Sequence, residues 1–303
     1  MDAFLPVRYN KNDSEFELLK KAKADLGMNG TERDILTDEL HRARREGVAE
    51  PEDLPFYLPA AGSGAAVLLV HGFSATPWEM RPLAGELVAR GFACLTVRLP
   101  GHGTTPEDLA ARRWEEWLES VTRGFDLLTG RFPRIYGAGL STGSLLLLAL
   151  ALRRQPDGLV LLSPYLRLRH RLAPFVGWLR YLKPYQHRAL AGEEARHYYE
   201  RRPLAGIHQI NRLLHTLAPR LGEITVPVLA IHGEGDQTVN IDSGRELVDR
   251  LGSKIKVYEQ LGPEAPHVLT GTENPLRGVV YDLIGKFLEG LETQACPPES
   301  KSR

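Results

Sequence analysis

The feature that most constrains this chain is the pattern Gly-x-Ser-x-Gly at residues 139–143, which centres on Ser141. An apolar run short enough for a buried strand, residues 135–138, precedes it, and a strong helix-forming run, residues 144–152, follows it. A serine at a sharp turn from a strand into a helix is typical of a nucleophile elbow, where glycines on either side avoid steric clashes. The N–H groups at the start of the helix point at any oxyanion that forms near the serine. The pattern predicts a nucleophilic serine, and the alternative is an ordinary strand–loop–helix connection with small residues.

The composition is that of an ordinary globular protein and argues against several classes of partner. Of 303 residues, 43% are hydrophobic and 25% charged, and 38 basic residues balance 38 acidic ones. Without a net charge, no overall field favours nucleic acid or an acidic membrane surface. The two cysteines, Cys94 and Cys296, cannot form a disulfide framework, and no spacing matches a zinc site. Because we find neither a signal peptide nor an apolar run of transmembrane length, we expect a cytoplasmic protein without an integral membrane segment.

Apolar runs and helical patterns alternate from residue 65 onward, which predicts a doubly wound α/β fold. The expected strands are short and apolar on both faces, so they suit a mostly parallel sheet that helices cover on both sides. These expected strands are residues 65–70, 92–99, 135–138, 159–163, 226–231 and 254–260. The expected helices are residues 80–90, 114–129, 144–152 and 275–291.

The same patterns divide the chain into regions. Residues 1–60 are charged and mostly helical in pattern, and we expect them to form an N-terminal extension packed on the body. Residues 61–163 and 223–292 carry the alternating strands and helices of the core. Residues 164–222 hold many aromatic and arginine residues but no convincing strand, so we expect several short helices inserted after a sheet strand. Residues 293–303 are expected to be a disordered tail.

A nucleophilic serine needs a base and an acid that orients the base, and doubly wound hydrolases supply them in the chain order serine, acid, histidine. Asp236 follows an expected strand in a glycine-rich turn, at the sheet edge where such proteins bind ligands. Glu234 and Asp242 are competing carboxylates, and a simple turn former is the alternative role for Asp236. His267 follows the next expected strand and is the histidine placed correctly downstream of Asp236. We therefore predict Ser141, Asp236 and His267 as the catalytic residues.

A further loop, His71-Gly72-Phe73-Ser74, directly follows the expected strand at residues 65–70. Its glycine lets the backbone approach closely, so that the N–H of Phe73 can join the N–H of Thr142 in a two-donor oxyanion hole. Several residues in or near these loops, and one in the inserted segment, are predicted to contact the substrate. They are His71, Gly72, His102, Leu140, Trp178 and Val239.

Five stretches of the sequence together resemble the α/β-hydrolases of the carboxylesterase and monoacylglycerol-lipase type. They are Leu68-Leu69-Val70-His71-Gly72-Phe73, Leu99-Pro100-Gly101-His102-Gly103, Gly139-Leu140-Ser141-Thr142-Gly143, His232-Gly233-Glu234-Gly235-Asp236 and Pro266-His267-Val268. The resemblance covers about residues 65–290. It implies that residues 164–222 form a lid or cap over the acyl site. It also implies that Ser141 is the nucleophile, His267 the general base and acid, and Asp236 its orienting partner.

The chain departs from that family pattern at two positions. Ser144 stands where many relatives carry a second glycine after the elbow, and Arg98 stands where many carry an aspartate. Neither position belongs to the predicted triad, but both could reshape the pocket.

These features predict a serine hydrolase that cleaves carboxylic esters through an acyl-enzyme intermediate, without a metal or an organic cofactor. The apolar and aromatic cap favours a small-molecule ester with a short or medium acyl chain, an aryl group or a monoglyceride-like alcohol. The same triad would serve a thioesterase, an amidase or peptidase, a lactonase or a carbon–carbon bond hydrolase, and the sequence leaves these open. A catalytically silent binding module with the hydrolase fold is the remaining alternative, although such proteins usually lose a triad residue.

Overall fold

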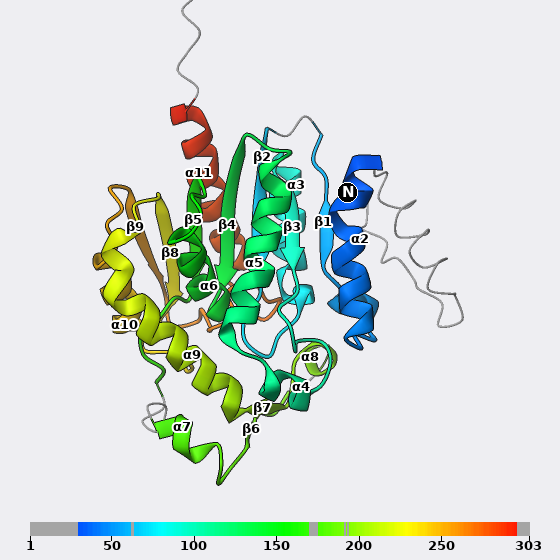
Figure 1. Cartoon of the computed structure of the whole chain (residues 1–303). Coiled ribbons are helices and arrows are strands. Elements are labelled where there is room, and N and C mark those ends of the chain that lie inside the picture. Colours follow the sequence, from blue (N-terminus) through cyan, green and yellow to red (C-terminus); the bar gives the residue numbers. More distant parts are fainter. Residues whose placement is uncertain (1–29, 62–63, 170–174, 191, 193, 296–303) are drawn as a thin grey trace, which may run out of the picture.

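The computed structural model describes residues 30–61, 64–169, 175–190, 192 and 194–295 (Figure 1). A seven-stranded sheet runs through this part of the chain, with the strand order β1-β3-β2-β4-β5-β8-β9. The strand β1 pairs antiparallel with β3, and the other neighbouring strands are parallel. The strands are β1 (Phe56–Leu58), β2 (Ala65–Val70), β3 (Ala93–Val97), β4 (Arg134–Leu140), β5 (Gly158–Leu162), β8 (Val228–Gly233) and β9 (Lys256–Leu261). The predicted α/β fold with a mostly parallel sheet is thus confirmed.

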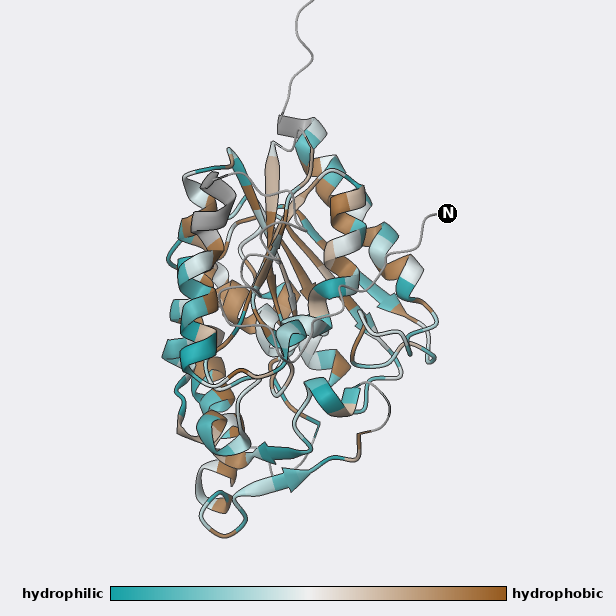
Figure 2. Ribbon diagram, turned by 90° about the vertical axis from the view of Figure 1, so that its right-hand side faces the viewer, coloured by the Kyte–Doolittle hydropathy of each residue, from teal (hydrophilic) through white to brown (hydrophobic). Residues whose placement is uncertain are grey.

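Helices cover both faces of the sheet. The inner strands are therefore buried on both faces, as their apolar sequences require. One face packs against α5 (Trp114–Thr129), α6 (Thr142–Ala151), α9 (Leu204–Leu217) and α10 (Ile241–Asp249). The other face packs against α3 (Arg81–Ala89) and α11 (Arg277–Ala295). Figure 2 shows the hydrophobic strands enclosed between helices whose outer surfaces are hydrophilic. The two edge strands differ from expectation. The strand β9 is partly exposed along its length. The strand β1 lies within residues 1–60, which we expected to form a helical extension outside the core, so that expectation was wrong for residues 56–58; three residues are too few to show a strand pattern in the sequence.

The described part of the N-terminal extension packs on the body beside the β1 edge (Figure 1). The helix α2 (Gly30–Arg45) buries Leu36 in the same apolar layer as α5. Its Glu39 Oε1 lies 2.9 Å from Nε of Arg123 on α5. Residues 1–29 of the expected extension lie outside the described residues.

The segment between β5 and β8 is less helical than we expected from the sequence. It contains α7 (Val176–Leu179), β6 (Tyr185–His187), α8 (Glu194–His197) and β7 (Arg201–Pro203), followed by α9. The strands β6 and β7 form an antiparallel pair, so the expectation of no strand here was wrong. Both are only three residues long and mostly polar and exposed, and they therefore leave no apolar alternation in the sequence.

Several contacts hold this segment against the body, among them hydrogen bonds to the loops after β2 and β3 and to the residues before β1. The backbone N–H of Tyr199 donates to the carbonyl of Ser74 at 3.0 Å, and the Tyr199 hydroxyl donates to the carbonyl of Gly101 at 3.0 Å. The Nδ1 atom of His197 lies 2.7 Å from Oδ1 of Asp53. We refer to residues 164–203 as the cap; α9, which follows it, packs on α5 and α6.

The remaining short helices are η1 (Pro51–Asp53), η2 (Pro77–Met80), α4 (Pro106–Ala111) and η4 (Ala218–Glu223). The final helix α11 runs to Ala295, and so beyond residue 292, where we expected the core to end. The rest of the predicted tail, residues 296–303, lies outside the described residues. Within the ranges that the structure describes, no helix combines the length and apolar character needed to cross a bilayer.

Candidate active site

The serine of the Gly-x-Ser-x-Gly pattern lies on a tight turn between β4 and α6. Ser141 has φ 56° and ψ −112°, a left-handed conformation that costs a non-glycine residue free energy. The turn also brings α6 against the end of β2, where a Cβ on Gly143 would lie 2.2 Å from the carbonyl oxygen of Val70. The glycine is therefore required at this position. The hydroxyl of Ser144, the first departure from the family pattern, donates to the carbonyl of Gly139 at 2.6 Å and thereby braces the turn.

The structure brings the three predicted catalytic side chains together from three separate loops. The Nε2 atom of His267 lies 3.0 Å from Oγ of Ser141. The Nδ1 atom of His267 lies 2.6 Å from Oδ2 of Asp236. A hydroxyl, an imidazole and a carboxylate in this order and at these distances have the geometry of a nucleophile, a base and the acid that orients the base.

The loops that carry the acid and the base are fixed by hydrogen bonds around them. Oδ1 of Asp236 accepts from the backbone N–H groups of Thr238 at 2.7 Å and Val239 at 3.0 Å. The hydroxyl of Ser163, at the end of β5, donates to the carbonyl of His267 at 2.8 Å. Val239 was predicted to contact substrate, but it is buried and does not line the cavity described below; its backbone instead orients the acid.

The Asp236 side chain is buried, and its surroundings keep it ionised. Burial opposes ionisation of the carboxyl, but the neighbouring imidazoles of His232 and His267 outweigh this effect and lower the pKa of Asp236 well below its ordinary value. The Nε2 atom of His232 lies 3.4 Å from Oδ2 of Asp236. Asp236 is therefore a permanent anion at neutral pH, and it can stabilise a positive charge on His267.

The two residues whose N–H groups we predicted to form an oxyanion hole, Phe73 and Thr142, line the same cavity as Ser141. The N–H of Thr142 is at the first position of α6, and the N–H of Phe73 lies in the loop after β2. Among the described residues, neither N–H has a hydrogen-bond partner, so both are free to bind an oxyanion. The pairing of Val70 with Gly139 places the end of β2 directly beside the elbow.

The loop after β2 is held in place by a buried carboxyl. Oε2 of Glu79, on η2, accepts from the backbone N–H of Gly72 at 2.6 Å, and Oε1 accepts from the Tyr198 hydroxyl at 2.7 Å. Burial raises the pKa of Glu79 to about 7 against the opposing effect of these hydrogen bonds. Glu79 was not predicted from the sequence, in which its only signal is a single acid within the mostly apolar η2.

His71 and His102 were predicted to contact the substrate, but both are fully buried and neither lines the cavity. Nδ1 of His71 lies 2.9 Å from the carbonyl oxygen of Gly72, and its Nε2 accepts from the N–H of Leu99 at 3.2 Å. Burial lowers the pKa of His71 to about 3, so this imidazole stays neutral and joins the two loops. The ring of His102 packs edge-on against Phe73, with 5.9 Å between ring centroids.

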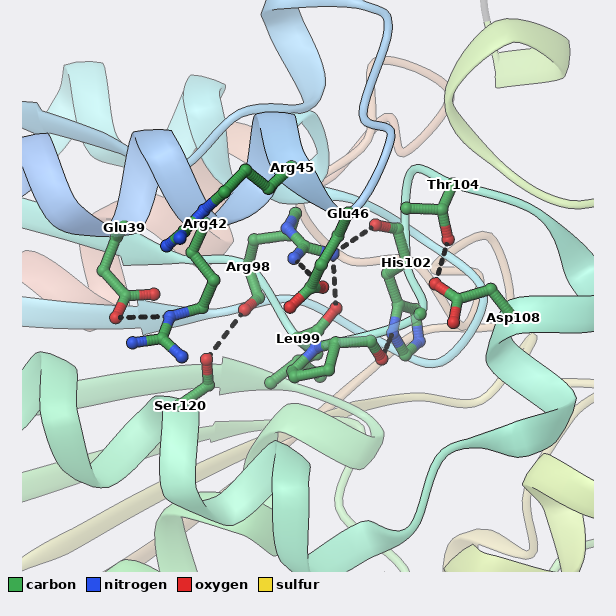
Figure 3. Close-up of polar contacts among 12 residues, drawn as sticks. Glu39, Arg42, Arg45, Glu46, Arg98, Leu99, His102, Thr104, Asp108 and Ser120 are labelled. Atoms are coloured by element: carbon green, nitrogen blue, oxygen red, sulfur yellow. Dashed lines mark hydrogen bonds and ion pairs between the residues drawn. The ribbon is translucent and has the colours of Figure 1, made fainter.

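The second departure from the family pattern, Arg98, holds the turn at residues 99–103 (Figure 3). Its buried guanidinium donates to the carbonyl of His102 at 2.9 Å. The carboxylate of Glu46, just after α2, forms an ion pair with it. The carbonyl of Arg98 accepts from the Ser120 hydroxyl at 3.1 Å. The extension thus supplies the counter-ion for a cation buried beneath the turn that supports Phe73.

A cavity of about 790 Å³ opens over Ser141 between the elbow and the cap. Gly72 and Leu140 line it, as predicted. Its apolar lining includes Leu140, Leu168, Val176, Leu179, Ile207 and Ile210. Trp178, also predicted to bind substrate, is 67% exposed and lies outside the lining, because the short helix α7 turns Val176 and Leu179 inward instead.

In the described part of the chain, no cluster of three or more His, Cys, Asp or Glu side chains could hold a metal ion.

Fold and site geometry together define an α/β-hydrolase of the serine hydrolase class. A family model described as "Serine aminopeptidase, S33" matches residues 62–271, and the chain belongs to this family. It is related at 26–34% identity to a monoacylglycerol lipase and a carboxylesterase, which makes it a member of the lipase and esterase group of serine hydrolases.

Two curated relatives come from bacilli. The chain is 34% identical over 190 residues to the thermostable monoacylglycerol lipase of Bacillus sp. (strain H-257), covering 61% of this chain and 75% of that protein. It is 26% identical over 241 residues to a carboxylesterase of Bacillus subtilis (strain 168), covering 76% and 95%.

Solved structures show the same fold. A structure from a study of the metagenome-derived lipolytic enzymes LipS and LipT aligns with a TM-score of 0.69 at 24% identity, covering 80% of this chain and 98% of that one. The monoacylglycerol lipase of Paleococcus ferrophilus aligns with a TM-score of 0.67 at 19% identity, covering 78% and 98%.

Proposed function

We propose that this protein hydrolyses carboxylic esters, with Ser141 as the nucleophile. The observation that carries the proposal is the arrangement of Ser141, His267 and Asp236 at 3.0 Å and 2.6 Å, at the floor of a cavity with two free N–H groups beside it. A buried anion, an imidazole and a hydroxyl aligned in this way activate the hydroxyl for attack on an acyl carbon.

The reaction follows from the positions of these groups. Nε2 of His267 accepts the proton of Ser141 as its Oγ attacks the ester carbonyl, while Asp236 stabilises the imidazolium. The N–H groups of Phe73 and Thr142 bind the oxyanion, and each such donor is worth about 3 kcal/mol in the transition state. His267 then protonates the leaving alcohol, and it next activates a water molecule that releases the acid from Ser141.

The cavity supports an ester with an apolar acyl part. Its apolar wall, formed by residues of the elbow, the cap and α9, can bury a short or medium acyl chain or an aryl group. The related lipase and carboxylesterase act on esters by name, which agrees with this choice. The same triad would also serve an amide, and the family description names an aminopeptidase, so peptide-bond hydrolysis is the second candidate.

Matched aryl substrates separate the two candidates. We expect p-nitrophenyl butyrate to be cleaved with a kcat/KM far above that of butyryl p-nitroanilide and of alanyl p-nitroanilide, and Ser141→Ala to abolish both ester and amide cleavage. Faster cleavage of either anilide would replace the esterase by an amidase or aminopeptidase. Unchanged ester cleavage by Ser141→Ala would reject the proposed nucleophile.

A further inference from the structure

The lining of the cavity also contains several cationic side chains. Arg169, Lys183, Arg188 and Arg202 line it, against the single carboxyl of Glu79. Two of the arginines are engaged: Arg169 donates to the carbonyl of Asp236 at 3.1 Å, and Arg188 lies 3.6 Å from Glu194. Burial raises the pKa of Glu79 to about 7, so it provides less than a full negative charge at neutral pH.

Arg202, on β7, differs from the other three in its surroundings. Its Nε atom is buried without a hydrogen-bond partner, and among the described residues no carboxylate lies within ion-pair distance of its guanidinium. Its Cζ atom instead stands 5.6 Å from the centroid of the Phe73 ring. The side chain as a whole is only partly buried, but a guanidinium nitrogen removed from water normally gains an acceptor, because losing its hydration is costly.

The position of Arg202 is close to the reacting groups. Phe73, on which it stacks, supplies one of the two N–H groups of the proposed oxyanion hole. The hydroxyl of Tyr165 lies 3.4 Å from Oγ1 of Thr142 and lines the same cavity. Burial raises the pKa of Tyr165 to about 12, and the charge of Arg202 opposes this rise, so the guanidinium is also within electrostatic reach of Tyr165.

Arg202 keeps its charge at neutral pH. Burial, together with the neighbouring cation Arg188, lowers the pKa of Arg202 to about 10, which still leaves it protonated in any physiological buffer. The Arg202 guanidinium therefore attracts an anion that enters the cavity.

We propose that Arg202 binds a carboxylate of the substrate, so that the ester cleaved at Ser141 belongs to the class of esters carrying a free carboxylate on the acyl or alcohol part. This inference rests on the proposed function and names its substrate class. The planar guanidinium matches a carboxylate through two parallel hydrogen bonds, and Arg188 and Lys183 add positive charge around the same space. The apolar wall takes the carbon chain between the carboxylate and the scissile ester.

A pair of esters that differ only in charge tests the proposal. Mono-p-nitrophenyl adipate carries a free carboxylate, and its methyl ester is neutral. For the wild-type protein we expect kcat/KM for the acid to exceed that for the methyl ester by about tenfold or more. In Arg202→Met this ratio falls to about one or below.

Two further variants control for folding and for net charge. Arg202→Lys retains a positive charge but loses the planar guanidinium that can donate two parallel hydrogen bonds. It should therefore keep only part of the preference for the acid over the methyl ester. Arg212→Met removes a charge from α9, where the arginine is exposed, paired with Glu115 at 3.0 Å and outside the cavity, and it should keep the full preference. The ratio of kcat/KM for the acid to that for the methyl ester in the wild-type protein tests the proposal by itself. The proposal can therefore be rejected even if Arg202→Met does not fold.

The possible failures are distinguishable. A wild-type protein that cleaves the neutral ester at least as well as the acid, or an Arg202→Met protein that keeps the wild-type ratio, overturns this inference and leaves the esterase intact. A folded wild-type protein that cleaves neither ester and whose Ser141 does not react with a fluorophosphonate overturns the proposed function and this inference together.

Discussion

The side chain of Glu79 accepts a hydrogen bond from the backbone N–H of Gly72 at 2.6 Å, one residue before Phe73. The same carboxyl accepts from the Tyr198 hydroxyl of the cap at 2.7 Å. A single buried group therefore ties the proposed oxyanion loop to the segment that covers the cavity. Glu79 also lines this cavity, so its state affects the site in two ways.

Removing this support should weaken catalysis. We expect Glu79→Ala to lower kcat on p-nitrophenyl butyrate by about 10- to 100-fold with a smaller change in KM. A displaced Phe73 N–H would stabilise the oxyanion of the transition state less well, whereas it contributes little to binding of the ground-state ester. Glu79→Gln, whose amide oxygen can still accept from Gly72, should keep kcat within about tenfold. An alanine variant with wild-type kcat would show that Gly72 is held by the rest of the loop.

The same residue predicts a pH dependence of stability. The pKa of Glu79 rises on folding from its ordinary value of 4.5 to about 7, so the folded chain binds more protons than the unfolded chain in this range. Its stabilising contribution is complete below pH 4.5 and is lost as the pH rises through 7, a change of about 3 kcal/mol. Glu79→Gln should therefore have a higher Tm than wild type at pH 8 and no advantage at pH 4.5. Parallel Tm profiles for the two proteins would contradict the assigned burial effect.

The ion pair between Glu46 and Arg98 should contribute more to the free energy of unfolding than an ordinary surface ion pair does. Removing Glu46 leaves the buried guanidinium of Arg98 without its anion (Figure 3). Because Glu46 is partly exposed, we expect Glu46→Ala to lower the free energy of unfolding by about 2 kcal/mol, less than for a fully buried pair. Glu50→Ala is the matched control: Glu50 is 3.4 Å from Arg196 in an exposed pair, and its loss should cost less than about 0.5 kcal/mol. Equal urea-unfolding curves for the two variants would refute the distinction.

A further prediction separates Asp236 from its sequence neighbour Glu234. Asp236→Asn should lower kcat by about 10³- to 10⁴-fold, because an amide cannot stabilise the imidazolium of His267 and favours the wrong tautomer. Glu234 is exposed, and its Oε1 accepts from Gln260 at 2.8 Å, away from the triad. Glu234→Gln should therefore leave kcat within about twofold. A large loss for Glu234→Gln and none for Asp236→Asn would exchange their roles.

The parts of the structure that could be predicted from the sequence are those that short, local sequence patterns determine. The buried strands β2 and β8 are apolar runs, and the turn at Ser141 is marked by glycines that its geometry needs. The loops after these strands could be located because parallel strands end at one edge of the sheet. The positions of Asp236 and His267 beside Ser141 follow from that topology.

The parts that the sequence did not predict depend on packing across distant segments. Glu79 becomes a support only because Gly72 and Tyr198 enclose it, and Arg202 becomes an unpaired cation only because β7 lies over Phe73. Nothing in the run Arg201-Arg202 distinguishes the second arginine from a solvated one. Trp178 shows the opposite error, since an aromatic side chain in an inserted segment suggested ligand contact but lies exposed on α7.

The most direct test of the account is the mass of the intact protein after treatment with a fluorophosphonate, with Ser141→Ala alongside. The account predicts one phosphonyl adduct on the wild type, located by peptide mapping at Ser141, and none on the variant. An adduct at another residue, or an unmodified wild-type protein with an intact fold, would contradict the claim that Ser141, His267 and Asp236 form an activated nucleophile.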